Sequence, residues 1–216
     1  MNSSDILING AKRFNVSLNK DRVRLFLEYL EILRLWNKKI NLTSIKVENE
    51  IIIKHFIDSL SVVPFIENES RVLDIGSGAG FPGIPLKIVK PSIQLTVFDS
   101  TQKKVFFLLE LINKLKLIGV NAVWGRAESR DNGVKRGYYS YVVSRAVGRI
   151  EDLIELSIPY LVDKGEIILM RGGRGLEEWE RSKEDIKQDS RLLRYNQYEL
   201  PKSTHKRVVL VISLEV

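Results

Sequence analysis

The stretch Val72-Leu73-Asp74-Ile75-Gly76-Ser77-Gly78-Ala79-Gly80-Phe81-Pro82-Gly83 decides the fold of this chain. Its apolar start is typical of a buried parallel strand, and it ends in a cluster of glycines. Glycine permits positive φ and lets a ligand lie against bare backbone, while the start of a following helix offers unpaired amide donors. A strand, a glycine loop and a helix in this order predict a ligand site at the carboxyl end of the strand.

Strand and helix signals alternate on the C-terminal side of this loop. Short apolar runs predict strands, and amphipathic stretches predict the helices between them. The expected strands are residues 93–98, 121–124, 140–144, 166–170, 192–200 and 207–214. One helix is expected to begin after Ser100 or Thr101, and two more are expected over residues 150–161 and 177–187. This alternation predicts an α/β fold with a mostly parallel twisted sheet and helices on both faces.

Residues 1–68 have a helical pattern instead. Apolar residues recur at three- and four-residue steps from Asn19 to Lys39, which is typical of an amphipathic helix. Shorter helices are expected over Ser4–Phe14 and over Glu48–Ile66, the latter interrupted only by Pro64. Because so few residues make a marginal core alone, we expect a single domain, 1–216. In it, residues 1–68 form an N-terminal helical cap on an α/β core of residues 69–216.

The composition excludes several kinds of site. The formal net charge of +7 suits an anionic partner and is equally compatible with a solvated surface. The absence of cysteine rules out disulfides, thiolate metal sites and a cysteine nucleophile, and two histidines cannot form a three-histidine site, so we expect no metal. No segment approaches the ~20 apolar residues of a membrane span, and the start lacks the order of a signal peptide. We therefore expect a cytoplasmic protein without a membrane partner.

Two carboxylates narrow the choice of ligand. Asp99 ends the second predicted strand, 19 positions after Gly80, where open α/β sheets place an acid on ribose hydroxyls. Glycines at alternate positions differ from the dinucleotide pattern G-x-G-x-x-G. Asp74 would repel a pyrophosphate but favour a cationic amino-acid group. These features favour S-adenosylmethionine; a nicotinamide-dependent oxidoreductase and a noncatalytic adenosylmethionine-binding or RNA-binding module are the alternatives.

The glycine loop, taken from Asp74 to Leu86, resembles the signature of the bacterial RsmG (GidB) family. Further matches, in family order along most of the chain, are Trp36-Asn37, Asn41-Leu42-Thr43-Ser44, His55-Phe56-Ile57-Asp58-Ser59, Asp99-Ser100 and Ser144-Arg145-Ala146. The resemblance implies a Rossmann-like class I S-adenosylmethionine-dependent methyltransferase fold. It also implies methyl transfer to N7 of one guanine in 16S ribosomal RNA, in the cytoplasm. The substrate is either naked RNA or an assembled small subunit, and we expect a monomer.

Carried over by position, the resemblance assigns cofactor contacts to Gly76, Phe81, Asp99, Ser100, Thr101, Ala127, Glu128 and Arg145. The loop itself adds Asp74 and Gly78 to this set. One departure is visible, because the family commonly has Lys-Gly after the fifth strand and this chain has Arg171-Gly172. Guanidinium and ammonium groups bind differently, so the role of this position is left open.

The residue inventory suits guanine N7 better than other methyl acceptors. C5 methylation of pyrimidines usually needs a cysteine. Methylation of exocyclic nitrogens commonly uses an Asp/Asn-Pro-Pro-Tyr/Phe motif, where this chain has Ser144-Arg145-Ala146-Val147. Guanine N7 carries an in-plane lone pair and no proton, so it needs no general base and the enzyme mainly orients the reactants. We expect Arg145 at the junction of cofactor and guanine, as a positioning residue rather than a proton acceptor; the alternative is an arginine that pairs with a structural acid such as Asp74.

Basic residues predict where RNA binds. Between Arg126 and Arg149 there are six Lys or Arg and two acidic residues, an excess that favours phosphate contacts. The residues expected to contact RNA are Asn41, Arg126, Arg130, Arg136, Arg149, Arg171, Arg174, Lys206 and Arg207, with Lys202 on the same face. Asn41 is equally compatible with an ordinary turn. His55 and Asp58, three apart on one predicted helical face, are expected to pair structurally.

Overall fold

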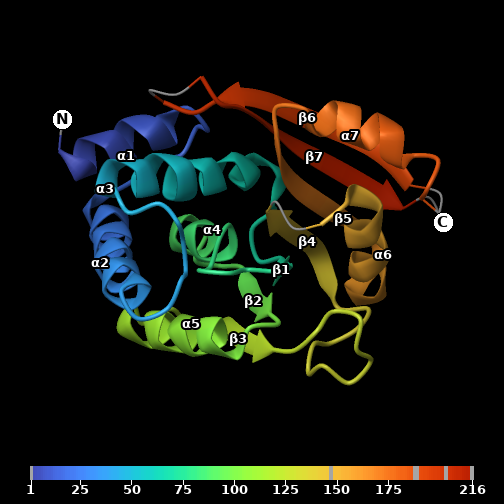
Figure 1. Cartoon of the computed structure of the whole chain (residues 1–216), viewed down its shortest axis with the longest axis horizontal. Coiled ribbons are helices and arrows are strands. Elements are labelled where there is room, and N and C mark those ends of the chain that lie inside the picture. Colours follow the sequence, from blue (N-terminus) through green and yellow to red (C-terminus); the bar gives the residue numbers. More distant parts are fainter. Residues whose placement is uncertain (1, 146–147, 187–189, 202–203, 215–216) are drawn as a thin grey trace.

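The computed structural model describes residues 2–145, 148–186, 190–201 and 204–214 (Figure 1). Its described strands form one sheet in the order β3-β2-β1-β4-β5-β7-β6. The parallel strands are β1 (Arg71–Ile75), β2 (Gln94–Asp99), β3 (Val120–Trp124), β4 (Tyr139–Arg145) and β5 (Leu161–Gly172). The last two, β6 (Ser190–Glu199) and β7 (Lys206–Leu214), are antiparallel to each other, and β7 is antiparallel to β5. The predicted mostly parallel sheet is confirmed.

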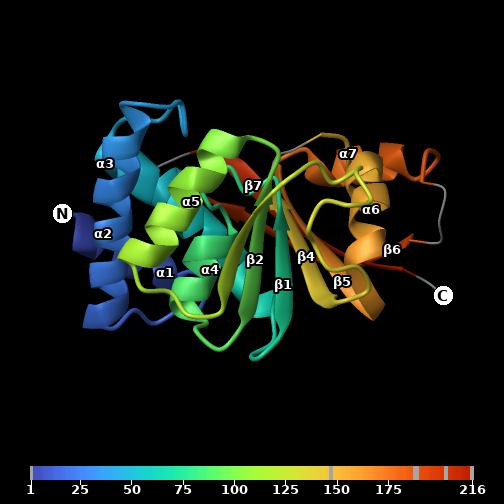
Figure 2. The ribbon, with the colours of Figure 1, turned by 90° about the horizontal axis from the view of Figure 1, so that it is seen from below.

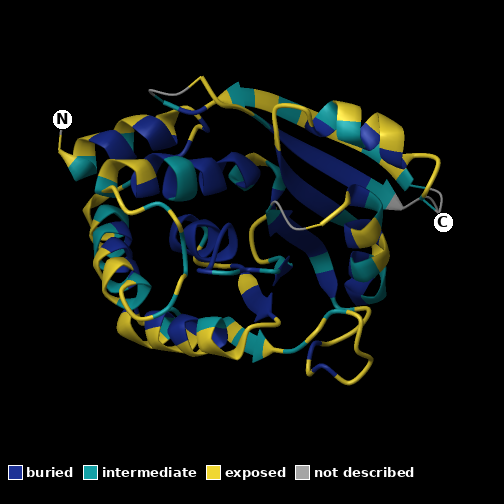
Figure 3. Cartoon of the chain, viewed as in Figure 1, coloured by how far each residue is buried: buried dark blue, intermediate teal, exposed yellow. Residues whose placement is uncertain are grey.

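Helices cover both faces of this sheet, as Figure 2 shows. Helices α4 (Gly83–Val89) and α5 (Gln102–Lys114) lie on one face, and α6 (Ile150–Ser157) and α7 (Gly175–Ser182) lie on the other. A short 3-10 helix, η3 (Ile158–Tyr160), links α6 to β5. Alternate residues of each strand enter one of two hydrophobic cores, so that Val72 packs with the first pair of helices and Leu73 with the second. The central strands are accordingly buried on both faces (Figure 3).

The N-terminal segment is helical, but its third helix is broken. Helices α1 (Ser3–Lys12) and α2 (Lys20–Asn37) begin at asparagine caps, because Asn2 and Asn19 each accept a bond from a first-turn amide. The helix expected over 48–66 consists of α3 (Glu48–Ile51), a π-helix η1 (Ile52–Ile57) and a 3-10 helix η2 (Leu60–Phe65). The last piece contains Pro64, which has no amide proton to donate to a regular helix.

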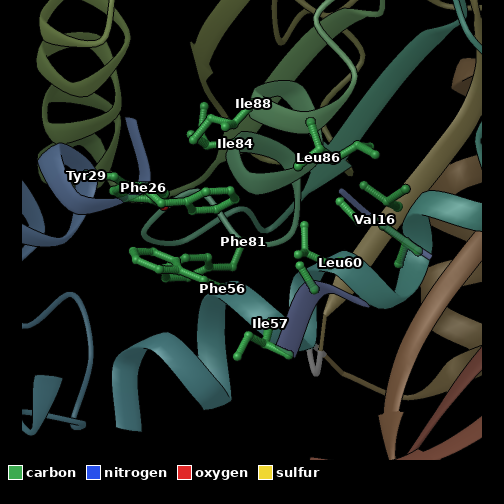
Figure 4. Packing of buried hydrophobic residues seen from close by; sticks show 14 of the residues in the cluster. Val16, Phe26, Tyr29, Phe56, Ile57, Leu60, Phe81, Ile84, Leu86 and Ile88 are labelled. Atoms are coloured by element: carbon green, nitrogen blue, oxygen red, sulfur yellow. The ribbon is translucent and has the colours of Figure 1, made fainter. Parts of the chain in front are cut away.

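An aromatic cluster joins these helices to the glycine loop (Figure 4). The ring of Phe81 lies 5.5 Å from that of Tyr29 and 5.9 Å from that of Phe56, and Phe56 lies 5.3 Å from Phe26. The Tyr29 hydroxyl also donates to the carbonyl of Ala79. Aromatic pairs at such distances add to the free energy gained from burial alone. The helical segment therefore packs directly on the loop at the carboxyl end of β1.

Candidate functional site

The glycine loop follows β1 and has left-handed backbone at Gly76 (φ 71°), Gly78 (φ 59°) and Gly80 (φ 94°). At Gly80 the space is closed, because a Cβ there would lie 2.8 Å from the Tyr29 hydroxyl and from Ile84. At Gly78 it is open, since the nearest atom to a Cβ would be the carbonyl oxygen of Gly76 at 3.9 Å. Gly80 thus permits tight packing against α2, whereas Gly78 leaves bare backbone for a ligand.

Asp74 lies beneath this loop and fixes the start of α4. Its Oδ2 accepts a 2.8 Å bond from the amide of Gly83, and its Oδ1 has no partner among the described residues. The side chain is fully buried, so the sequence-based expectation of a ligand ammonium group against Asp74 does not fit this geometry. Burial raises the pKa of the Asp74 carboxyl to about 7, and the Gly83 amide opposes that rise.

This raised pKa predicts that stability falls as pH rises. Below about pH 4 the carboxyl is protonated in both states, and between about 4 and 7 only the unfolded state releases the proton, which favours unfolding. At about 1.4 kcal/mol per pKa unit, the loss from pH 4 to 8 is a few kcal/mol. Asp74→Asn should flatten that part of the urea-unfolding profile, while Asp163→Asn at an exposed site should leave it intact. An unchanged slope in Asp74→Asn would contradict this interpretation.

Asp99 connects the end of β2 to the glycine loop. Its Oδ2 accepts a 2.9 Å bond from the amide of Gly78, and its Oδ1 accepts a 2.8 Å bond from the amide of Thr101. Lys104 lies 3.9 Å from the same carboxylate. Each carboxylate oxygen has two acceptor sites, so both still have one for a ligand hydroxyl.

A cavity of about 330 Å³ opens beside Asp99, at the carboxyl ends of β1, β2 and β3. Five residues predicted from the sequence to bind a cofactor line it: Gly76, Asp99, Ser100, Ala127 and Glu128. Phe98, Leu153 and Leu156 supply apolar wall. Apolar surface for an adenine ring, with carboxylates for ribose hydroxyls, fits the adenosine part of S-adenosylmethionine.

Arg145, at the end of β4, lies in a separate cluster that faces the helical segment. Its Nη2 lies 3.1 Å from Nδ1 of His55, and its Nη1 donates to the carbonyl of Lys54 at 3.2 Å. The guanidinium lies 4.9 Å from the Phe81 ring centre and 3.7 Å from Asp58. The ten residues expected to bind the cofactor are therefore not all in one place. Five of them line the cavity beside Asp99, whereas Phe81 and Arg145 lie on the side of the helical segment and do not line it.

The expected pairing of His55 with Asp58 is wrong. Among the described contacts each of them meets Arg145 instead, and Asp58 also accepts a 2.8 Å bond from the hydroxyl of Tyr198. The reason is the π-helix, since its wider turn does not align residues three apart as an α-helix would. Burial lowers the pKa of His55 to about 3, and the Arg145 charge adds to that effect, so His55 is neutral at physiological pH.

The residues expected to contact RNA are differently exposed. Asn41, Arg126, Arg130, Arg136, Arg149, Arg174 and Lys206 are exposed. Arg149 pairs with Glu151 and lies 3.7 Å from Asp152 and 3.6 Å from Asp185. Arg207 is half-buried, 3.7 Å from Asp58. Ala146 and Lys202 lie outside the described residues.

Among the residues expected to contact RNA, Arg171 differs most from the expectation because it is buried. The side chain is 8% exposed, and its Nη1 donates to the carbonyl of Gly148 at 2.8 Å. Strand alternation places it on the side of α6 and α7, where Leu169 also points, whereas Met170 belongs to the opposite core. The expectation that Arg171 belongs to an exposed basic face is therefore wrong.

Several residues that shape the site were not expected from the sequence. Asn37 accepts from the amides of Leu42 and Thr43 and so fixes the loop after α2. The Ser77 hydroxyl accepts from the amide of Phe98 at 2.9 Å, which joins the glycine loop to β2. The Ser144 hydroxyl donates to the carbonyl of Ile75 at 2.9 Å, which joins β4 to β1. All three residues stand in stretches that resemble the RsmG family, but their hydrogen-bonding roles have no further sequence signal than a short polar residue near the end of a helix or strand.

Comparison with known proteins decides the family. The family model described as rRNA small subunit methyltransferase G (GidB) matches residues 22–206. The chain belongs to this family. It is 40% identical to ribosomal RNA small subunit methyltransferase G of Alkaliphilus oremlandii, covering 87% of this chain and 80% of that protein. It is also 40% identical to the protein of the same name from Acetivibrio thermocellus, covering 96% and 86%.

Solved structures of methyltransferases share the fold of this family member. A SAM-dependent methyltransferase from Aquifex aeolicus matches with a TM-score of 0.56 at 19% identity, covering 72% of this chain and 89% of that chain. TYW2 from M. jannaschii in complex with AdoMet matches with a TM-score of 0.54 at 20% identity, covering 71% and 73%. The predicted Rossmann-like class I methyltransferase fold is confirmed, and the chain is an S-adenosylmethionine-dependent rRNA methyltransferase. The oxidoreductase and noncatalytic alternatives are set aside.

The described part of the chain contains no candidate for a membrane-spanning helix or for a metal site. Within the described ranges, no helix is long and apolar enough to cross a membrane. The same residues contain no group of three or more His, Asp or Glu side chains arranged to hold a metal ion.

Proposed function

We propose that this protein transfers the methyl group of S-adenosylmethionine to N7 of one guanine in 16S ribosomal RNA, in the cytoplasm. The observation that carries the proposal is that the site has two parts, a cavity for the cofactor and an arginine at the end of β4. An adenosine-sized cavity lies beside Asp99, and the Arg145 guanidinium is held at the end of β4 by the Lys54 carbonyl, the neutral His55 ring and the Asp58 carboxylate. The names of the relatives, which specify the small ribosomal subunit, support the choice of RNA.

The residues that face the cavity would bind S-adenosylmethionine and orient it. Asp99 would accept ribose hydroxyls, and Ala127 with Glu128 would border the adenine ring. The open backbone at Gly78 would lie against the amino-acid portion. S-adenosylmethionine supplies an electrophilic methyl group when bound. The remaining cofactor contacts proposed are Gly76, Phe81, Ser100, Thr101 and Arg145.

The proposed reaction requires no proton acceptor from the protein. Guanine N7 has a lone pair and no proton, so alignment of the reactants carries most of the rate enhancement. Neither buried candidate base suits the task, because His55 accepts a bond from Arg145 and Asp74 is enclosed beneath the loop. Arg145 would orient the guanine. It would do so without gripping N7 and O6 together, because N7 must face the methyl group.

Exposed arginines after β3 should contribute the salt-dependent part of RNA binding. The double variant Arg130→Gln/Arg136→Gln should weaken binding and reduce the slope of log affinity against log salt by about 1 for each phosphate that is no longer neutralised. Affinity for small-subunit RNA would be measured from about 50 to 200 mM salt. The control Arg13→Gln/Arg24→Gln removes equal charge from exposed positions on the helical segment. Equal slopes in the two double variants would contradict the assignment.

The proposed function is tested by transfer of labelled methyl groups from S-adenosylmethionine. Protein-free 16S RNA, assembled small subunits and large-subunit RNA would be compared as acceptors. We expect label in one or both of the small-subunit substrates and none in the large-subunit RNA. Absence of label in both small-subunit substrates would reject the proposal.

A further inference from the structure

A second cavity, of about 900 Å³, lies under the loop that joins α2 to α3. This segment arches away from the helices in Figure 1, and Figure 3 shows it largely exposed or half-buried. Leu33, Leu42, Ile45 and Ile51 give the cavity an apolar floor. Asn37, Asn41, Thr43 and Ser44 add amide and hydroxyl groups. We call it the cap pocket.

Positive charge surrounds the cap pocket. Lys38 and Lys46 are exposed at its edge, and within the described part of the chain neither makes an ion pair. Arg34 also lines it, but lies 3.1 Å from Glu31 and 3.2 Å from Glu48, which neutralise its charge. No Asp or Glu occurs among the described lining residues. The pocket therefore favours an anionic ligand that also has an apolar part.

The loop is held in place by hydrogen bonds to α2. Asn37 accepts from the amide of Leu42 at 2.9 Å and from the amide of Thr43 at 3.0 Å, and its own amide donates to the Thr43 carbonyl at 2.9 Å. Asn41 and Ser44, which line the cap pocket, stay exposed. Because the backbone is fixed, a ligand would find these groups already placed.

The cap pocket is linked to Arg145 through one imidazole ring. The Thr43 hydroxyl lies 2.7 Å from Nε2 of His55, and Nδ1 of the same ring lies 3.1 Å from Nη2 of Arg145. The His55 ring stacks on Phe81 at 4.7 Å, which fixes its plane. Thr43, which lines the pocket, is therefore connected to the Arg145 guanidinium by two successive contacts through one ring.

We propose that the cap pocket binds one nucleotide of the RNA substrate, adjacent to the nucleotide that Arg145 orients. This inference rests on the proposed function. The base lies on the apolar floor with its polar edge toward Asn41 and Ser44, as single-stranded RNA is commonly recognised. The phosphate lies against Lys38 and Lys46, whose unpaired ammonium groups attract it.

Charge removal tests the phosphate contact. Lys38→Gln/Lys46→Gln should weaken binding of protein-free 16S RNA at least about fivefold, and should reduce the salt slope by about 1 for each phosphate left without its lysine. The matched control Lys12→Gln/Lys114→Gln removes the same charge at exposed positions outside the cap pocket. We expect less than about a twofold change in the control, because those positions face no phosphate. Equal losses in both pairs would show a general charge effect and overturn the proposal.

A carboxylate placed inside the pocket tests its location. Ser44→Asp puts a negative charge on a lining residue, whereas Val47→Asp puts the same charge on the same loop at an exposed residue that does not line the pocket. Ser44→Asp should weaken RNA binding at least about tenfold, and Val47→Asp less than about threefold. Similar effects of both variants would overturn the assignment. Both positions are exposed, and thermal melting of each variant checks folding.

Binding is measured without cofactor, so the two proposals fail separately. If the wild type methylates small-subunit RNA and the pocket variants bind it as the controls do, only the pocket proposal fails. If the pocket variants lose RNA binding selectively and the wild type labels no RNA, only the proposed function fails.

Discussion

Asp99→Asn should weaken binding of S-adenosylmethionine about a hundredfold or more. The carboxylate accepts bonds from the amides of Gly78 and Thr101 and, as proposed, from two ribose hydroxyls. The asparagine replaces one acceptor oxygen with an NH₂ group, which faces an amide donor. Hydrogen bonds to charged groups contribute about 1.5–3 kcal/mol each, so losing one ribose contact and disturbing the loop costs roughly 3 kcal/mol, which is about a hundredfold.

Titration calorimetry with the cofactor measures this effect directly. Asp163→Asn makes the same substitution at an exposed position of β5 and should leave affinity unchanged. Thermal melting of both variants checks that the change in the glycine loop has not caused unfolding. A folded Asp99→Asn variant that binds within about threefold of the wild type would contradict the assignment of Asp99.

Arg145→Met should lower the single-turnover rate of methyl transfer about a hundredfold at saturating cofactor and RNA. Misplacing a reactant by about 1 Å can cost that much when orientation carries the rate. Methionine is also a long side chain, but it removes the cation–π contact with Phe81 and the donors that meet His55 and the Lys54 carbonyl. Arg145→Lys keeps the charge without the planar fork, so it should restore only part of the rate.

Folding must be separated from rate in this experiment. Removing Arg145 takes one cationic partner from the buried Asp58 and leaves Tyr198 and Arg207, so the cost should stay below the figure of about 3–5 kcal/mol for a buried charge left without any partner. The double variant Arg145→Met/Asp58→Asn removes both charges and should regain stability without regaining rate. Arg13→Met, at an exposed position, is the control. Rates in Arg145→Met equal to those of the control would discard a positioning role.

The strand, loop and helix around Gly76 could be predicted because each has a strong local cause. A buried parallel strand is continuously apolar, and positive φ favours glycine, so both features are visible as patterns in the sequence. Asp99 was predictable for the same reason, since its place follows from the end of a strand. The structure places it against the amides of Gly78 and Thr101, with a cavity beside it.

Side-chain direction and burial could not be predicted in the same way. Asp74 stands two residues before Gly76, the first glycine of the loop. Strand alternation buries its side chain under the amide of Gly83, away from solvent. Arg171 is basic and is the last residue but one of β5, yet strand alternation turns it toward α6 and α7. His55 and Asp58 do not pair, because a π-helix replaces the expected α-helix. The cap pocket depends on how Asn37 folds a loop back on its own helix.

The most direct test of the central claim is the position of the methyl group in the product. Small-subunit RNA treated with the enzyme and S-adenosylmethionine would be reduced and cleaved chemically at 7-methylguanine, and the cleavage sites read by primer extension. We predict one enzyme-dependent cleavage, at a single guanine of 16S RNA. Incorporation of a methyl group without any such cleavage would show that the acceptor is another atom and would contradict the account.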